Sequence, residues 1–174
     1  MKKIFLLYLH FIFVNHYEFF SQELISNTNF IDLDPWTEHF TSNGSELYQD
    51  DTHTDDGSGS YKLISHGTYN SHIRAIIAGD KIEAGSHILS FYVKNIGPTT
   101  ARVRPKLIQS SQYNPPAYRT TTNQWEHVQH RVSLTKGIDL QLRLYNNTND
   151  SARTFLIDDV SLKLIKWNGA KDSE

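Results

Sequence analysis

The sequence contains no cysteine, and this absence removes several classes of site at once. Without a thiol, the chain has no disulfide, no thiolate zinc site, no iron–sulfur cluster and no cysteine nucleophile. A chain of 174 residues is long enough to bury a real hydrophobic core, so folding requires neither disulfides nor a structural metal. We therefore expect one domain of ordinary size.

An excess of one charge is lacking as well, because 17 Lys and Arg residues stand against 19 Asp and Glu residues, for a formal net charge of −2. This balance argues against nucleic acid as a partner, since domains that bind nucleic acid are usually strongly basic. The sequence also lacks a nucleophile elbow, an H-E-x-x-H zinc helix and a phosphate-binding loop. We therefore do not expect an enzyme.

Only the first residues contain a long apolar run. Lys2 and Lys3 precede the apolar stretch 4–14, which is too short to span a bilayer but typical of a secretory signal peptide. We predict a signal peptide over residues 1–21, although Phe19 is large for its place before the cleavage site. The alternatives are an uncleaved membrane anchor and a buried first strand. We expect an exported bacterial protein, secreted or at the cell surface, whose mature chain is monomeric and has no membrane span.

The remaining sequence lacks helical periodicity and instead alternates apolar and polar residues, which is typical of strands with one buried face. A proline at position 105 predicts an edge or a bulge in its strand. Turns rich in Gly, Asn and Pro separate the segments, so we predict an all-β, two-sheet antiparallel β-sandwich over residues 22–166 and a polar tail over 167–174. The clearest strands are expected at 88–94, 101–107, 138–145 and 156–164, and weaker ones at 23–30, 45–49, 60–65, 71–77 and 126–134.

Several pieces of sequence, taken in order, resemble a known family. These are Leu24–Phe30 followed by Trp36, then Gly57–Leu63, Gly85–Lys94, Gln124–Val128 and Phe155–Leu162. Together they resemble the jelly-roll carbohydrate-binding modules of families 4, 9 and 22, which are galactose-binding-like sandwiches, over residues 24–165. The resemblance implies a jelly roll that binds a polysaccharide or oligosaccharide without catalysis. The alternative is a structural or adhesive surface sandwich without a sugar site, because this fold serves several functions.

Alternation in the last strand places Asp158 on the core face with Leu156 and Val160. A buried carboxylate is costly unless a cation or several backbone N–H groups compensate it. The resemblance implies a structural calcium ion, held by the closing Asp and an acidic residue near the opening strand. Ile31 stands where the family has that acidic residue, so Asp32 and Asp158 are the predicted metal ligands. The alternative is that Asp158 accepts backbone hydrogen bonds without a cation.

The acidic segment 50–57 also resembles a cation-binding loop, but it does not have the ligand spacing of an EF-hand. We predict a solvated loop there.

Sugar binding requires aromatic rings against the apolar faces of pyranoses and planar polar groups for their hydroxyls. Outward strand positions and the long loop 109–123 offer such residues. Each has a structural alternative: an exposed Arg can be merely solvated, Tyr92 can pair across strands, and the loop tyrosines can pack their own loop. The sequence does not show which of these strands share a sheet. The predicted binding residues are Tyr69, His72, Arg74, Tyr92, Arg104, Tyr113, Tyr118, Arg143 and Tyr145.

Overall fold

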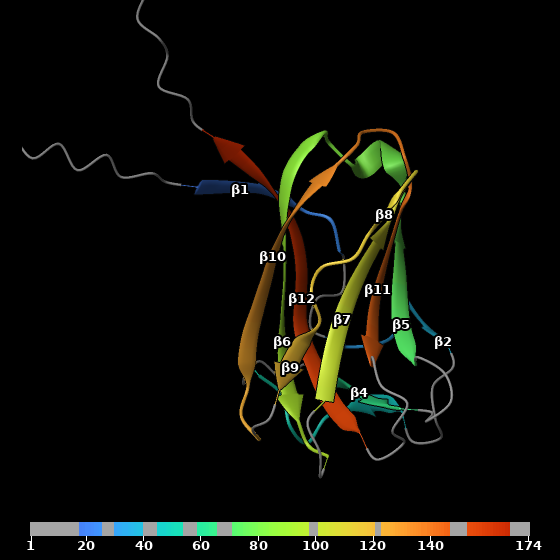
Figure 1. The fold of residues 1–174 in the computed structure, drawn as a ribbon, viewed down its shortest axis with the longest axis vertical. Helices are drawn as coiled ribbons and strands as arrows, with labels where there is room; N and C mark the ends of the chain where they lie inside the picture. Colours follow the sequence, from blue (N-terminus) through green and yellow to red (C-terminus); the bar gives the residue numbers. More distant parts are fainter. Residues whose placement is uncertain are drawn as a thin grey trace, which may run out of the picture.

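The computed structural model describes residues 18–25, 30–39, 45–53, 59–65, 71–97, 101–120, 123–146 and 153–167. Within these ranges, two antiparallel sheets of six strands each pack face to face (Figure 1). The predicted all-β, two-sheet sandwich is confirmed. The described part of the chain has a single 3-10 turn, η1 (Gly79–Lys81), and no helix of it is long and apolar enough to cross a membrane.

Each sheet mixes strands from distant parts of the sequence. The first sheet has the order β10 (Glu126–Leu134), β6 (Gly85–Asn95), β12 (Thr154–Trp167), β4 (Ser60–Ile64) and β3 (Glu46–Tyr48), and β1 (Glu18–Glu23) pairs with the far end of β12. The second sheet has the order β2 (Trp36–His39), β5 (His72–Ile77), β11 (Leu140–Asn146), β7 (Ala101–Ile108) and β8 (Gln112–Tyr113), and β9 (Tyr118–Thr120) pairs with the other end of β7.

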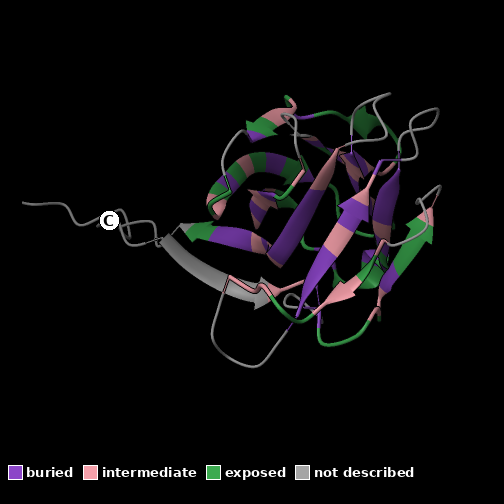
Figure 2. Cartoon of the chain, turned by 90° about the horizontal axis from the view of Figure 1, so that it is seen from below, coloured by how far each residue is buried: buried purple, intermediate pink, exposed green. Residues whose placement is uncertain are grey.

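The core lies between the two sheets and is built from alternate residues of the strands. Leu89, Phe91 and Val93 of β6 face Leu142 and Leu144 of β11, and all five are 0% exposed. Figure 2 shows how buried residues alternate with half-buried and exposed ones along the strands. Burial of one such side chain contributes roughly 1.5–3 kcal/mol. The inward set therefore fixes the register, and with it the residues that point outward from each sheet.

The N-terminal strands differ from the prediction. The described residues 24, 25 and 30 of the expected strand over 23–30 are not in a strand, because β1 ends at Glu23 and Phe30 has a left-handed backbone with φ of 47°, while residues 26–29 lie outside the described residues. β1 begins at Glu18, inside the predicted signal peptide, and pairs with the end of β12. Residues 1–17 and 168–174 lie outside the described residues, so the signal peptide and the polar tail stay predictions.

The prediction that Asp158 shares the core face with Leu156 is wrong, because β12 contains a β-bulge. Asp158 lies opposite Tyr92 and Ser161 lies opposite Ser90, so two residues of β12 oppose one residue of β6 between these pairs. Asp159, one of the two, has a φ of 50°. The extra residue reverses the alternation. Ile157 and Val160 therefore both face the core, whereas Leu156 and Asp158 point to the outer side of the first sheet.

Candidate functional site

The outward face of the second sheet brings together five of the predicted binding residues. They are His72 and Arg74 of β5, Arg143 and Tyr145 of β11, and Arg104 of β7. Tyr145 lies directly opposite His72 on one side and Arg104 on the other, and Arg143 lies opposite Arg74. Residues that oppose each other in a ladder project from the same face. We call this surface the β5–β11–β7 face.

A row of three rings crosses this face at one end. His39 of β2 lies opposite His72, and their ring centroids are 4.8 Å apart. The Tyr145 ring stacks on the other side of His72 at 4.4 Å. These neighbours explain why His72 points outward and is nevertheless only 3% exposed. Because both faces of the His72 ring are covered, the row presents ring edges and polar atoms to a ligand, and not the free ring faces that we expected.

Beside Tyr145 the surface opens into a groove of about 420 Å³. Its floor and one wall come from β7 and β11, and the other wall comes from the segment that joins β8 to β9. The lining residues are Arg104, Lys106, Tyr145, Gln112, Asn114, Pro115, Pro116 and Ala117. The groove thus offers two cations, two side-chain amides and a hydroxyl next to the apolar surface of two prolines.

Pro105 marks the point at which the groove opens. β9 pairs with residues 101–103 of β7 and β8 pairs with residues 107–108, so no described strand pairs with residues 104–106 on that side. Pro105 has no N–H to donate to a neighbouring strand. A proline is therefore tolerated at this position, where one side of β7 is unpaired. The predicted edge is confirmed here, and its neighbours Arg104 and Lys106 project into the groove.

Hydrogen bonds hold the arginines of the β5–β11–β7 face in place. Arg143 donates from Nε to Gln141 Oε1 at 2.5 Å and from Nη1 to the Tyr145 hydroxyl at 2.8 Å. Arg74 donates from Nε to Thr37 Oγ1 at 3.0 Å. All three acceptors are neutral, so these bonds orient the guanidinium groups and leave their charge uncompensated.

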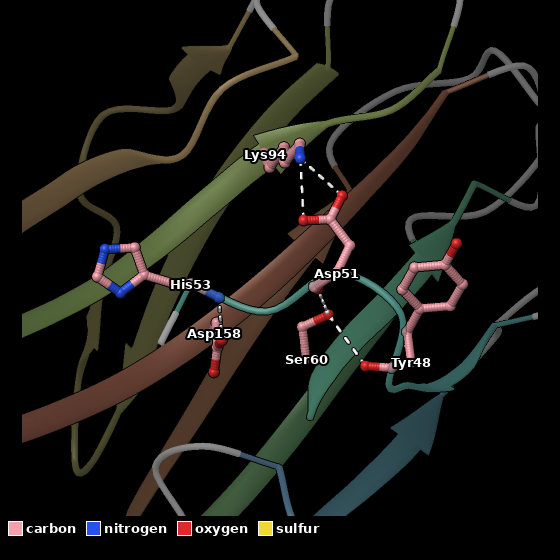
Figure 3. A network of polar contacts seen from close by, with 6 residues as sticks. All are labelled: Tyr48, Asp51, His53, Ser60, Lys94 and Asp158. Atoms are coloured by element: carbon pink, nitrogen blue, oxygen red, sulfur yellow. Dashed lines mark hydrogen bonds and ion pairs between the residues drawn. The ribbon is translucent and has the colours of Figure 1, made fainter. Parts of the chain in front are cut away.

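Tyr92 lies on the opposite side of the molecule, on the outer face of the first sheet. Its ring is stacked between His127 at 4.5 Å and His53 at 3.4 Å. His127 is its direct cross-strand partner, so Tyr92 does pair across strands as the alternative proposed. His53 belongs to the segment 51–53, which crosses over this sheet (Figure 3). Tyr92 therefore does not join the β5–β11–β7 face.

The segment 51–53 is anchored over Asp158, so the prediction of a solvated loop over 50–57 is wrong for residues 51–53, whereas Asp50 is exposed. His53 N donates to Asp158 Oδ2 at 2.8 Å (Figure 3). Asp159 N donates to Asp158 Oδ1 at 2.8 Å. Lys94 Nζ lies 2.6 Å from Asp51 Oδ2. Asp158 is 0% exposed, and burial raises the pKa of its carboxyl group to about 6.

The contacts of the two predicted metal ligands, Asp158 and Asp32, are with backbone N–H groups. Both carboxylate oxygens of Asp158 accept backbone N–H groups. Asp32 is exposed, and its Oδ1 accepts the N–H of Asp34 at 2.9 Å within its own turn. No group of three His, Asp or Glu residues in the described ranges could hold a metal ion. The described residues therefore fit the alternative, in which Asp158 accepts backbone hydrogen bonds, and calcium stays a prediction.

The remaining predicted residues lie elsewhere. Tyr113 is opposite the inward-facing Leu107, so it projects away from the β5–β11–β7 face, and it lines a small cleft of about 70 Å³ towards β10. Tyr118 packs against the core and donates to Glu126 Oε2 at 2.7 Å, a hydrogen bond that raises the pKa of Tyr118. Tyr118 thus packs against the core and is hydrogen-bonded to β10. Tyr69 lies outside the described residues.

Comparisons with known proteins concern the fold. No protein-family model and no curated protein matches the sequence. Among solved structures, the chain is similar to the CBM22-1–GH10 modules of an endo-1,4-β-D-xylanase from Clostridium thermocellum, complexed with xylohexaose, with a TM-score of 0.63 and 16% identity. That match covers 87% of this chain and 30% of the xylanase chain, so this chain spans less than a third of that protein.

Two isolated binding domains are also similar to this chain. The CBM22-1 xylan-binding domain from Paenibacillus barcinonensis has a TM-score of 0.58 and 18% identity, and the match covers 75% of this chain and 86% of that domain. TmCBM61, in complex with β-1,4-galactotriose, has a TM-score of 0.56 and 13% identity over 82% of this chain and 98% of that one. The resemblance to carbohydrate-binding modules is therefore confirmed for the fold.

Proposed function

We propose that the chain is a non-catalytic carbohydrate-binding domain and that its β5–β11–β7 face binds a polysaccharide or oligosaccharide. The observation that carries this proposal is the in-register row of His39, His72, Tyr145 and Arg104, which runs directly into the groove of about 420 Å³. The row crosses three strand spacings, roughly 14 Å, so more than one sugar unit can lie along it. Structures of the same fold carry xylohexaose and galactotriose, which supports a sugar as the ligand.

The chemistry of the face suits sugar hydroxyls. Arg143, Gln141 and the Tyr145 hydroxyl form one hydrogen-bonded group, in which the remaining N–H groups of the planar guanidinium can bind neighbouring hydroxyls in pairs. The prolines of the groove offer a flat apolar surface to the C–H faces of a pyranose. A ligand at the middle of the row is bound mainly by hydrogen bonds to ring edges and side chains, since both faces of the His72 ring are covered.

The face is also poorly suited to glycoside hydrolysis. That reaction normally uses two carboxyl groups on either side of the scissile bond. Within the described residues, no Asp or Glu occupies an outward position of β2, β5, β7 or β11. The proposed role is therefore binding without catalysis.

The test compares Tyr145→Ala with Tyr92→Ala in affinity electrophoresis against xylan and galactan. We expect Tyr145→Ala to weaken binding about tenfold or more, a loss of about 1.4 kcal/mol or more, because it removes the ring that joins the row to the groove. Tyr92→Ala is the matched control, since it removes the middle ring of a stack on the other face and should leave binding unchanged. Wild-type binding by folded Tyr145→Ala protein would refute the proposed site, and failure of the wild type to bind any glycan would leave the structural or adhesive alternative.

Export and calcium are separate parts of the proposal. Export is supported by the basic start and the apolar stretch 4–14, and N-terminal sequencing of protein recovered outside the cell tests it. Calcium is supported by the family resemblance alone. If calcium is bound, a chelator will lower the melting temperature. An unchanged melting temperature would leave the buried Asp158 compensated by its backbone hydrogen bonds.

A further inference from the structure

The β5–β11–β7 face carries a concentration of positive charge that the composition of the chain does not suggest. Outward positions of the second sheet hold six cationic side chains, whereas the whole chain has a formal net charge of −2. No acidic residue occupies an outward position on any described strand of that sheet. The cationic residues are Arg74, Arg102, Arg104, Lys106, Arg119 and Arg143.

These cations stand opposite one another in the ladders. Arg143 is directly opposite Arg74 on one side and Lys106 on the other, so three positive charges lie in one row across three strands. Arg102 and Arg119 form a second like-charged pair between β7 and β9. Like charges in direct cross-strand positions lower the stability of a sheet.

In the described part of the chain, no acidic partner relieves this repulsion. None of the six cations forms an ion pair with a carboxylate of the described residues. Arg74 and Arg143 donate to the neutral oxygens of Thr37, Gln141 and Tyr145, and Lys106 Nζ lies 5.6 Å from the centre of the Tyr145 ring. These cations repel one another, and the hydrogen bonds hold some of them in fixed positions. Such an arrangement is suited to binding a ligand that carries negative charge.

We infer that the β5–β11–β7 face prefers an anionic polysaccharide, whose carboxylate or sulfate groups neutralise the row of Arg74, Arg143 and Lys106. This inference rests on the proposed function and specifies its class of ligand. Guanidinium groups bind planar carboxylates through two parallel hydrogen bonds and bind sulfate oxygens in a similar way. Arg104 and Lys106 also line the groove, so an acidic sugar in the groove meets two cations next to the Tyr145 hydroxyl.

The experiment uses pairs of polymers that differ only in charge. Polygalacturonate is compared with its methyl-esterified form, and dextran sulfate with dextran, by calorimetric titration of the whole chain. We expect at least one charged polymer to bind about tenfold tighter than its neutral counterpart. The advantage should shrink when the salt concentration rises from about 50 mM to about 500 mM, because salt screens exposed charges. The uronate pair and the sulfate pair show separately which anion the face prefers.

Protein variants locate the effect. Arg143→Gln and Lys106→Gln should each lower the affinity for the preferred charged polymer several-fold. Arg131→Gln is the control, because Arg131 is an exposed cation on β10 of the first sheet and its replacement changes the net charge equally. If Arg131→Gln lowers the affinity as much as Arg143→Gln, the attraction belongs to the whole molecule and the inference is wrong.

The remaining outcomes separate this inference from the proposed function. If charged and neutral polymers of a pair bind equally well, the anionic preference is refuted while sugar binding stands. If folded protein binds none of the polymers, nor xylan or galactan, both fail. If single-stranded DNA binds as tightly as the better charged polysaccharide, the face is a general polyanion surface and the inference of a polysaccharide ligand is wrong.

Discussion

The two outer faces of the sandwich contain similar side chains in different settings. Each face has a stack of three rings built from two histidines and one tyrosine. On the first sheet the segment 51–53 supplies one of the rings and covers part of the sheet (Figure 3). On the second sheet all three rings come from strands. The two stacks are His53, Tyr92 and His127 on the first sheet, and His39, His72 and Tyr145 on the second.

The cations of the two faces differ in whether they contact a carboxylate. Three lysines of the first sheet each contact a carboxylate, whereas the six cations of the second sheet have no described carboxylate partner. The first-sheet pairs are Lys62 with Glu46, Lys94 with Asp51, and Lys163 with Glu23. A stack of two histidines and one tyrosine is therefore not by itself a sign of a binding site. A site is indicated where, among the described residues, no loop segment joins the stack and the neighbouring cations have no carboxylate partner.

Among the variants that test this comparison, Asp158→Ala is expected to have the largest effect on stability. It removes the acceptor that anchors the segment 51–53. The backbone N–H groups of His53 and Asp159 lose their partner in a buried place, so we expect a loss of about 2–4 kcal/mol in the free energy of unfolding. Urea denaturation measures this loss. Glycan binding by the folded variant should be unchanged, and a loss of less than about 0.5 kcal/mol would contradict the structural role of the covered face.

The next largest effects are expected from Tyr92→Ala, which should mainly lower stability, and Tyr145→Ala, which should mainly lower glycan binding. Tyr92→Ala should lower the free energy of unfolding by about 1–3 kcal/mol, because the ring packs between two others and against the sheet. Tyr145→Ala should lower glycan affinity by more than it lowers stability. Urea denaturation and titration of the same two preparations test this reversal, and a similar pattern of losses in both variants would remove the distinction between the faces.

The sequence predicts the sandwich well wherever one face of a strand is strictly apolar. β6 and β11 alternate without interruption, and both were predicted from that alternation. β2, β8 and β9 have only two to four residues, too few to show a period, so they were missed. His39 was missed with β2. The position of Asp158 was mispredicted because a bulge adds one residue, and nothing in the local sequence signals that shift.

The candidate site was predicted only in part, since convergence depends on strand order. Arg74 and Arg143 were selected as outward residues, but only the ladders of β5 and β11 show that they oppose each other. Lys106 is not part of any motif in the sequence. It is a candidate binding residue only because the ladder places it opposite Arg143, where it extends the row of cations. Tyr92 and Tyr145 look equivalent in sequence, and their difference lies in what covers them.

The third prediction is a pH dependence of stability, which arises from Asp158 on the outer face of the first sheet. Asp158 has a pKa of about 6 in the folded protein and an ordinary pKa of 3.8, so the folded state retains a proton that the unfolded chain has lost between these values. Ionisation in this range therefore favours unfolding, and the contribution of Asp158 to stability falls as the pH rises from about 4 to about 6.

Asp158→Asn should flatten this part of the pH profile. The buried His87 contributes in the opposite direction, because burial lowers the pKa of its ring and the unfolded chain then takes up a proton first as the pH falls below 6.5. The difference between wild-type and variant profiles of unfolding free energy isolates the contribution of Asp158. Parallel profiles over pH 4–6 would show that its carboxyl group is not perturbed.

The smallest effect on stability is expected from a substitution on the β5–β11–β7 face. Lys106→Gln removes one charge from the row and should raise the free energy of unfolding by about 0.2–1 kcal/mol, since it relieves repulsion with Arg143. Lys94→Gln is the matched control on the first sheet and should lower the stability, because it breaks the contact with Asp51. Differential scanning calorimetry in low salt measures both, and a loss of stability in Lys106→Gln would show that its charge is compensated.

The central claim is that a sugar ligand occupies the outer face of the second sheet and not that of the first. Amide chemical shifts, recorded while trigalacturonate or xylohexaose is added to the isotope-labelled protein, test this most directly. The account predicts shifts concentrated in β5, β7, β11 and the segment 112–117, with β6, β12 and the segment 51–53 unaffected. Shifts confined to the first sheet, or none at saturating concentrations of either sugar, would contradict it.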